Sequence, residues 1–94
     1  MAQTADITAY TPDAGSITMF STSWCGYCRR LKSQLSRAGI AYREVDIEDH
    51  PDAADVVARV NDGNLTVPTM LFADGTALTN PSVSQVQQKM TTAG

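Results

Sequence analysis

The sequence predicts one α/β domain, a four-stranded mixed sheet with helices on both faces in the order β-α-β-α-β-β-α. Short β-prone runs alternate with amphipathic stretches in the first half of the chain. A dipeptide favoured in hairpin turns separates two further runs in the second half. The 94 residues have room for one modest core and no second domain. A right-handed β-α-β unit should place the first strand at the centre of the sheet.

The domain should occupy residues 17–94, after a flexible N-terminal extension over residues 1–16. The residues of the extension are small and polar, and their apolar positions follow neither the strand period nor the helix period. The extension is therefore either mobile or ordered by contact with the domain. Ile17–Ser21 is a short apolar run typical of a buried strand. The strand leads directly into a segment that contains both cysteines of the chain.

Residues 29–38 predict the first helix, which Gly39 should end as a residue in the left-handed conformation. Its apolar face carries Leu31, Leu35 and Ala38, and basic residues take the other faces. Residues 41–47 should form the second strand. A second helix then begins with Pro51 at its first position, with Asp49 or His50 as its cap and with an inner stripe of Ala53, Val56, Val57 and Val60.

Residues 69–73 and 76–79 should pair as an antiparallel hairpin across Asp74-Gly75, a favoured type I′ turn. A last helix follows, with Val83, Val86 and Met90 facing inward. Its start allows two interpretations. Ser82 can form a capping box with Gln85, or Asn80 can cap a helix that has Pro81 at its first position.

Composition and charge exclude several functions. A net charge of −3 and a pI of about 4.7 argue against binding to nucleic acid or to an anionic membrane surface. No run of 18 apolar residues is present, so we expect no membrane span. The first residues do not resemble a secretory signal, and we therefore expect a cytoplasmic protein.

Cys25 and Cys28 are the only two cysteines and lie three positions apart. A disulfide across such a short loop stabilises a fold little, because the stabilisation grows with loop length. A zinc site needs four ligands, and the rest of the chain offers one His and no further Cys. The pair therefore indicates a redox site that cycles between dithiol and disulfide.

Cys25 should lie at the N-terminus of the first helix, where free N–H groups and the helix dipole favour a thiolate. Cys28 should lie one turn further and face inward, so it suits the role of a resolving thiol. Arg29, Arg30 and Lys32 either strengthen the thiolate modestly or are simply a solvated face. Gly26 leaves the loop between the cysteines flexible.

Two aromatic residues and a proline accompany the cysteines. Trp24 and Tyr27 flank the pair, and such aromatics are more often packing groups than contacts for a ligand. Pro68 starts the third strand, and a cis Val67–Pro68 bond there would leave the Val67 N–H and C=O free to pair with a substrate backbone. The proximity to the cysteines favours this functional interpretation.

The sequence resembles the glutaredoxin branch of the thioredoxin superfamily over about residues 17–92, on Trp24–Cys28, residues 66–69 and Asp74-Gly75. It resembles more closely the mycoredoxins of actinobacteria, on residues 22–28, 60–69 and 78–82. The resemblance implies the thioredoxin/glutaredoxin fold and reduction of mixed disulfides between proteins and mycothiol. It also implies arsenite release from arsenate–mycothiol adducts, with mycothiol as reducing co-substrate and no bound cofactor or metal.

The resemblance has one informative departure. Glutaredoxins carry an acidic residue before the last helix that helps to hold the amino-acid head of glutathione, whereas this chain has the neutral Thr79-Asn80-Pro81-Ser82. Neutral hydroxyl and amide groups suit the sugar hydroxyls of mycothiol. We therefore expect Cys25 and Cys28 to be catalytic, and substrate to be bound by Trp24, Gly26, Tyr27, Val67, Pro68, Thr79, Asn80 and Ser82.

Two other functions are open at this stage. The chain could be a protein-disulfide electron donor to ribonucleotide reductase, recycled by thioredoxin reductase, or a dimeric module that bridges an iron–sulfur cluster. The intact Cys28 would compete for the cluster site, so the monomeric enzyme is favoured. His50 is expected to be a helix cap, and the acidic residues between positions 44 and 49 are expected to be a solvated edge.

Overall fold

The sheet has the order β2-β1-β3-β4 in the computed structural model, which describes residues 7–93. β1 (Ile17–Ser21) runs parallel to β2 (Tyr42–Asp46) and antiparallel to β3 (Thr69–Phe72). β3 in turn pairs antiparallel with β4 (Ala77–Thr79). The predicted fold class is confirmed, with the first strand at the centre of a mixed sheet.

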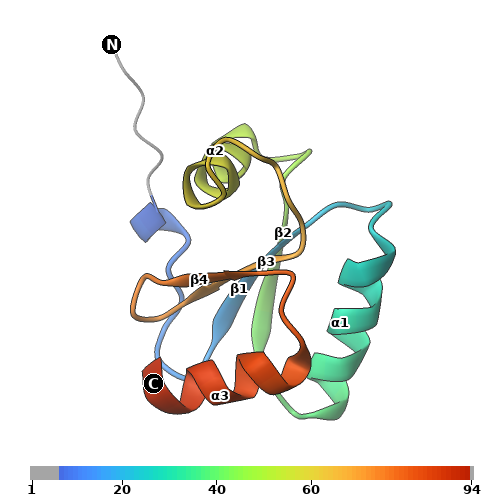
Figure 1. Ribbon diagram of the computed structural model, residues 1–94, viewed down its shortest axis with the longest axis vertical. Coiled ribbons are helices and arrows are strands. Elements are labelled where there is room, and N and C mark those ends of the chain that lie inside the picture. Colours follow the sequence, from blue (N-terminus) through green and yellow to red (C-terminus); the bar gives the residue numbers. More distant parts are fainter. Residues whose placement is uncertain (1–6, 94) are drawn as a thin grey trace.

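Helices cover both faces of this sheet (Figure 1). On one face, α1 (Gly26–Arg37) and α3 (Val83–Ala93) enclose a core that includes Ile17, Met19, Leu31, Leu35, Met70, Phe72 and Val86. On the other face, α2 (Pro51–Val60) encloses a second core of Tyr10, Phe20, Val45, Ile47, Ala53, Val56, Val57 and Leu71. Alternate residues of β1 enter opposite cores, as the two-residue strand period requires.

The strand register brings two distant segments together at one end of the sheet. Because β1 and β3 are antiparallel, the carboxyl end of β1 lies beside the amino end of β3, and Phe20 pairs with Thr69. The segment that contains Cys25 follows β1, and the segment that contains Pro68 precedes β3. These two segments are therefore neighbours although about 40 residues separate them.

α1 begins earlier than the sequence predicts. The predicted helix started at Arg29, but the structure has Gly26–Arg37, with Cys25 itself as the N-cap. Its end is as expected: Gly39 has a φ of 72° and follows the helix in the left-handed conformation. The N–H of Ile40 donates to the carbonyl of Leu35 at 3.0 Å, which completes the expected helix stop.

The predicted type I′ turn is wrong. Gly75 has a φ of 85°, but Asp74 is not among the described residues with positive φ, and a type I′ turn needs both. The Gly75 N–H donates to Phe72 O and the Phe72 N–H donates to Thr76 O, each at 2.9 Å. This pattern is a three-residue loop in which a left-handed glycine follows a turn. Asp74 Oδ1 accepts from the Thr76 hydroxyl and N–H and holds the loop, and these bonds lower the pKa of Asp74 to about 2.

Of the two starts that the sequence allowed for α3, the structure has the capping box. The Ser82 Oγ accepts from the Gln85 N–H at 3.1 Å, and the Gln85 Oε1 accepts from the Ser82 N–H at 2.8 Å. Asn80 has a φ of 47° and lies outside the helix, so it is not the cap. For α2, His50 occupies the N-cap position before Pro51, but its side chain makes no capping hydrogen bond.

The folded domain begins earlier than residue 17. A 3₁₀ turn spans Ile7–Ala9, and the next residue, Tyr10, is buried with 7% of its surface exposed. Its ring packs edge-on against Phe20, and its hydroxyl donates to Asp52 Oδ2 at 2.6 Å. The Tyr10 carbonyl accepts from the buried Thr18 hydroxyl at 2.6 Å. Of the two interpretations of the extension, a tail ordered by contact therefore describes Tyr10, while residues 1–6 lie outside the described part.

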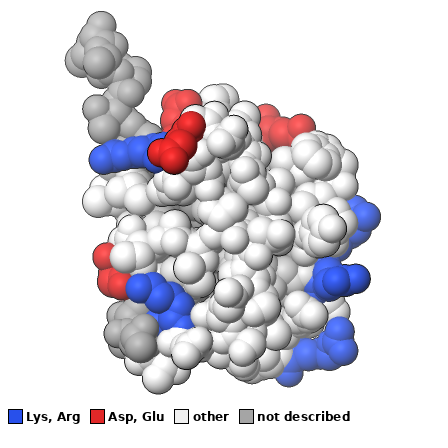
Figure 2. All heavy atoms as spheres, in the orientation of Figure 1, with Lys and Arg blue, Asp and Glu red and all other residues white. Residues whose placement is uncertain are grey.

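Charged side chains are unevenly distributed over the surface. Four of the seven Lys and Arg residues belong to α1, and Figure 2 shows blue side chains along the edge where α1 lies. The α1 side is thus locally basic although the chain is acidic overall. In the described residues 7–93, no helix is long and apolar enough to cross a membrane.

The burial of Tyr10 predicts a stabilising role for a segment outside the sheet. Tyr10→Ala should lower the free energy of unfolding by about 3 kcal/mol, because it removes a buried aromatic ring. Tyr27→Ala is the matched control, since Tyr27 is 66% exposed, and it should change stability by less than about 0.5 kcal/mol. Urea unfolding measures both. Equal effects of the two substitutions would contradict the packing of Tyr10.

The bond between Tyr10 and Asp52 predicts a defined pH dependence. The hydrogen bond from the Tyr10 hydroxyl lowers the pKa of Asp52 below 3.8. The stabilisation of the fold by ionised Asp52 is therefore present above pH 3.8 and is lost as the pH falls through the lowered pKa. The same bond, together with burial, raises the pKa of Tyr10 above 10.0, and that contribution is lost as the pH rises through the raised pKa.

The stability difference between the wild type and Tyr10→Phe should therefore be largest between pH 3.8 and 10.0 and shrink outside this range. Urea unfolding across a pH series measures this difference. A difference that stays constant into strong acid and strong base would show that the hydroxyl does not hold Asp52.

Candidate active site

Cys25 lies at the N-terminus of α1, as the sequence predicts. Its backbone is extended, with φ −82° and ψ 109°, and its Sγ accepts a hydrogen bond from the Cys28 N–H at 3.1 Å. Sulfur here takes the place of the oxygen that usually caps a helix. The same N–H and the positive end of the helix dipole would stabilise a thiolate in the reduced protein.

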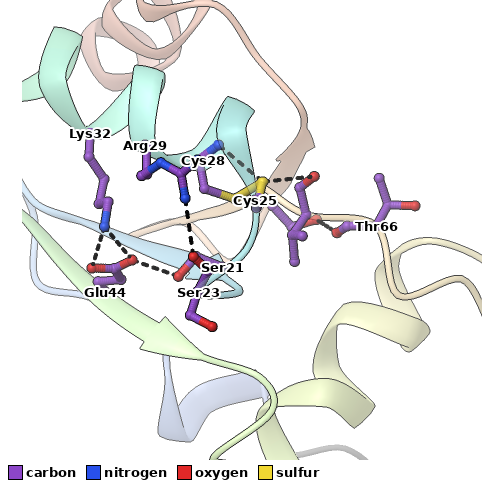
Figure 3. The surroundings of a disulfide bond; sticks show 10 residues. Ser21, Ser23, Cys25, Cys28, Arg29, Lys32, Glu44 and Thr66 are labelled. Carbon is purple, nitrogen blue, oxygen red and sulfur yellow. Dashed lines mark hydrogen bonds and ion pairs between the residues drawn. A yellow bond between two sulfur atoms is a disulfide. The ribbon is translucent and has the colours of Figure 1, made fainter.

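Cys25 and Cys28 form a disulfide, with their Cα atoms 5.2 Å apart (Figure 3). Cys28 has 1% of its surface exposed and packs in the core under α1 and α3, whereas Cys25 has 5% exposed. The more accessible sulfur is thus the one at the helix N-terminus. This arrangement agrees with an attacking Cys25 and a shielded Cys28.

Exposed aromatic residues flank the buried disulfide. Trp24 and Tyr27 are 68% and 66% exposed, so the expectation that such aromatics serve mainly as packing groups is wrong at both positions. The Trp24 indole N–H donates to Glu48 Oε2 at 3.0 Å, which fixes the ring at the surface. A Cβ added at Gly26 would meet nothing within 4 Å. The surface between the two cysteines is therefore bare.

The basic residues of α1 are mostly engaged within the protein. Lys32 Nζ forms an ion pair with Glu44 at 3.0 Å, and Arg29 Nη1 donates to the carbonyl of Ser23 at 3.2 Å (Figure 3). Partial burial would raise the pKa of Glu44, but hydrogen bonds from Ser21 and Lys32 outweigh burial and lower this pKa. Lys32 thus neutralises Glu44, which leaves less positive charge to support a thiolate.

The Val67–Pro68 segment lies against Cys25, as the strand register requires. The carbonyl oxygen of Val67 is 4.0 Å from Cys25 Sγ, and the Val67–Pro68 peptide bond is cis. Pro68 is buried and Val67 is half-buried. The chain next to Pro68 is thus positioned to contact anything that reacts at Cys25.

A groove of about 280 Å³ lies between α1 and the start of α3. Of the predicted binding residues, Tyr27, Asn80 and Ser82 line it, together with Arg30, Leu31, Gln34 and Pro81. Thr79 does not line it, and its hydroxyl donates instead to Asn61 Oδ1. Sequence reasoning missed Gln34 as a groove residue. The helical spacing of positions 27, 30 and 34, which share one face, was the available signal.

A second recess of about 480 Å³ lies on the other flank of α1. It is lined by His50, which was expected to be a helix cap, and by three residues of the acidic edge that was expected to be solvated, Glu44, Asp46 and Asp49. The other lining residues are Thr22, Ser23, Arg29 and Lys32. The buried Thr22 hydroxyl has no hydrogen-bond partner among the described residues. Within residues 7–93, no group of three or more His, Cys, Asp or Glu side chains could hold a metal ion. The chemistry that this site supports is thiol–disulfide exchange.

Comparison with known proteins supports this chemistry. The sequence model of the glutaredoxin family matches residues 17–77. A Mycobacterium tuberculosis protein described as a glutaredoxin is 56% identical over 75 residues, which cover 80% of this chain and 89% of that protein. Mycoredoxin 1 of Corynebacterium glutamicum is 40% identical over 75 residues, which cover 80% of this chain and 92% of that protein.

A solved structure has the same fold. The crystal structure of the glutaredoxin from Methanosarcina mazei Go1 has a TM-score of 0.70 at 21% identity and covers 82% of this chain and 79% of that one. Because the matched segment contains β1, the cysteine pair and Pro68, the chain belongs to the glutaredoxin family, and its similarity to mycoredoxin 1 supports a place among the actinobacterial mycoredoxins.

Proposed function

We propose that this protein reduces mixed disulfides between proteins and mycothiol, with Cys25 as the nucleophile. The observation that carries the proposal is the position of Cys25 Sγ, which accepts the Cys28 N–H at 3.1 Å at the N-terminus of α1. This position favours a reactive thiolate. Tyr27, two residues after Cys25, lines the groove between α1 and the start of α3. The groove offers a place for the small-thiol arm of the substrate.

The chemistry consists of two thiol exchanges. The Cys25 thiolate attacks the mycothiol sulfur of the mixed disulfide, forms a Cys25–mycothiol disulfide and releases the protein thiolate, which takes a proton from water. The thiolate of a second mycothiol then attacks the mycothiol sulfur of this adduct, releases oxidised mycothiol and restores the Cys25 thiolate. In a second route, Cys28 attacks Cys25 and releases mycothiol, which leaves the Cys25–Cys28 disulfide for two further mycothiols to reduce.

The chemistry of the groove supports a sugar-containing thiol. Asn80 and Ser82 offer neutral amide and hydroxyl groups, and no Asp or Glu lines the groove. The ammonium group of glutathione would find no carboxylate there, whereas sugar hydroxyls can donate to and accept from neutral groups. The 40% identity to Mycoredoxin 1 of Corynebacterium glutamicum adds support.

Exposed apolar side chains support a polypeptide as the other arm of the substrate. Trp24, Tyr27 and Leu65 are the large hydrophobic residues exposed within residues 7–93. In sequence, Trp24 adjoins Cys25 and Tyr27 adjoins Cys28, while Leu65 precedes the Val67–Pro68 segment. Such side chains suit contact with a protein surface rather than with a small polar molecule. We propose that Trp24, Gly26, Tyr27, Val67 and Pro68 contact the substrate.

Substitution of each cysteine tests the roles of the two thiols. Cys25→Ser should lower kcat/KM on a mycothiol–peptide mixed disulfide by at least about 10³-fold, because it removes the nucleophile. Cys28→Ser should stay within about threefold of the wild type, since a second mycothiol can resolve the adduct. Ultraviolet titration of Cys28→Ser should give a pKa of Cys25 well below that of an ordinary thiol, because the helix N-terminus stabilises the thiolate. An inactive Cys28→Ser beside an active Cys25→Ser would reverse the assignment.

A comparison of reductants tests the identity of the thiol. The wild type should turn over a mycothiol–peptide disulfide with mycothiol at least about tenfold faster than the glutathione equivalent with glutathione. Asn80→Asp should reduce this preference by about three- to tenfold, because a carboxylate in the groove can bind the ammonium group of glutathione. Aspartate also tolerates the left-handed backbone of position 80, where φ is 47°.

Gln87→Glu, an exposed position on α3, adds the same charge outside the groove and is the matched control. It should leave the preference unchanged. Equal turnover with both thiols in the wild type would remove the support for mycothiol while leaving disulfide reduction intact.

A further inference from the structure

We propose that Asn61 and Thr69 are positioning residues that orient the Thr66–Val67 peptide so that its N–H faces an incoming substrate. The proposal rests on the proposed function, because it concerns how the polypeptide arm of a mixed disulfide is held beside Cys25. Neither residue touches the cysteines. They act through the chain segment that precedes Pro68.

The Thr69 side chain fixes one end of this peptide. Thr69 is completely buried, and its hydroxyl donates to the carbonyl oxygen of Thr66 at 2.7 Å. Within residues 7–93, the Val67–Pro68 bond is the only cis peptide, so the Thr66–Val67 peptide is trans and planar. The C=O and N–H of a trans peptide point in opposite directions. The Val67 N–H therefore points away from the Thr69 hydroxyl.

The Val67 N–H makes no hydrogen bond with any part of residues 7–93. The adjacent Val67 carbonyl oxygen is 4.0 Å from Cys25 Sγ. A free donor so close to the reacting sulfur can pair with a backbone carbonyl of a polypeptide bound there, as an added strand does at a sheet edge. If the Thr66–Val67 peptide were rotated, the Val67 N–H could not form this hydrogen bond with the substrate.

The Asn61 side chain holds the Thr69 hydroxyl in turn. Asn61 Nδ2 donates to Thr69 Oγ1 at 3.2 Å and to the Val57 carbonyl at 2.9 Å. Its Oδ1 accepts from the Thr79 hydroxyl. Because Asn61 Nδ2 donates to Thr69 Oγ1, the Thr69 hydroxyl proton is directed to Thr66.

The Asn61 side chain thus links α2, β3 and β4 next to the segment that precedes Pro68. Asn61 is the C-cap residue of α2, while Thr69 begins β3 and Thr79 ends β4, where the two threonines are paired residues. The segment is also held from its other end, where the Asn80 N–H donates to the Pro68 carbonyl at 2.7 Å. The positions of Thr66 and Pro68 are therefore both fixed by the ends of regular elements, and the Val67 N–H between them remains free.

The test uses Thr69→Val, which keeps the shape of the side chain and removes the hydroxyl, with Thr69→Ser as the conservative variant. Thr69→Val should raise KM for a mycothiol–peptide mixed disulfide about three- to tenfold with little change in kcat, which corresponds to the loss of one hydrogen bond. Thr69→Ser should restore KM. The rate of Cys25 alkylation by iodoacetamide should be the same in all variants, because the thiolate is untouched.

Asn64→Ala is the matched control, since Asn64 Nδ2 donates to the Asn61 carbonyl at 3.0 Å and this bond does not reach Thr66. It should leave KM unchanged. Asn61→Asp is a second variant, which keeps the size of the side chain and its acceptor for Thr79 but removes both donors. It should raise KM in the same direction as Thr69→Val.

The amide resonance of Val67 gives a readout that does not depend on the reaction. It should shift in Thr69→Val and return toward its wild-type position in Thr69→Ser. The proposal is overturned if this resonance is unchanged, if Thr69→Ser does not restore KM, or if alkylation slows as much as turnover. A wild type that reduces no mixed disulfide would instead refute the proposed function, while the Val67 resonance would still report on the orientation of the peptide.

Discussion

The hydrogen bond from the Cys28 N–H to Cys25 Sγ is the interaction on which the site depends. It makes a sulfur atom the cap of α1 and places that sulfur at the end of the helix where partial positive charge gathers. The bond exists only because β1 ends at Ser21 and the chain turns into the helix within a few residues. One local feature thus decides where α1 begins and, in the proposed mechanism, which cysteine is the nucleophile.

The sheet supplies the second half of the site through its register. The pairing of Phe20 with Thr69 brings the segment around Pro68 to the carboxyl end of β1, where ligands of open α/β sheets commonly bind. A shift of this register by one residue would turn Met19 and Phe20 toward the wrong cores and move Val67 away from Cys25. The two packed cores therefore also protect the geometry of the site. In this sense, the stability of the fold and the alignment of the site have the same cause.

The sequence alone could predict the features that depend on local pattern. The central strand, the position of Cys25 at a helix N-terminus and the proximity of Pro68 follow from short-range periodicity and from the order of elements. The burial of Tyr10 could not be predicted, because it depends on contacts with Phe20, Thr18 and Asp52 that form only in the assembled fold, and Asp52 lies 42 positions away in the chain. The hairpin turn was misjudged because Asp-Gly also fits a longer loop in which only the glycine is left-handed.

Thr79 shows the same limit within the site. Its neighbours Asn80 and Ser82 line the groove, and a hydroxyl at position 79 looks equally suitable in the sequence. As the last residue of β4, however, it presents its hydroxyl to Asn61, and this contact becomes visible only when α2, β3 and β4 are assembled. Residue type therefore indicates the right region, and strand geometry decides which of these residues line the groove.

The start of α3 shows how the fold forms a groove without an acidic side chain in its lining. A helix N-terminus has free N–H groups and attracts anions, so an uncapped helix here would favour an acidic ligand or an acidic side chain. In this chain, Ser82 and Gln85 satisfy each other's N–H groups with neutral oxygen atoms. No carboxylate is then needed at the end of the helix, and Asn80 can stand outside it in a left-handed conformation. The capping box thus allows the groove to be polar without being charged at the end where α3 begins, and the proposed binding of a sugar-bearing thiol rests on this property.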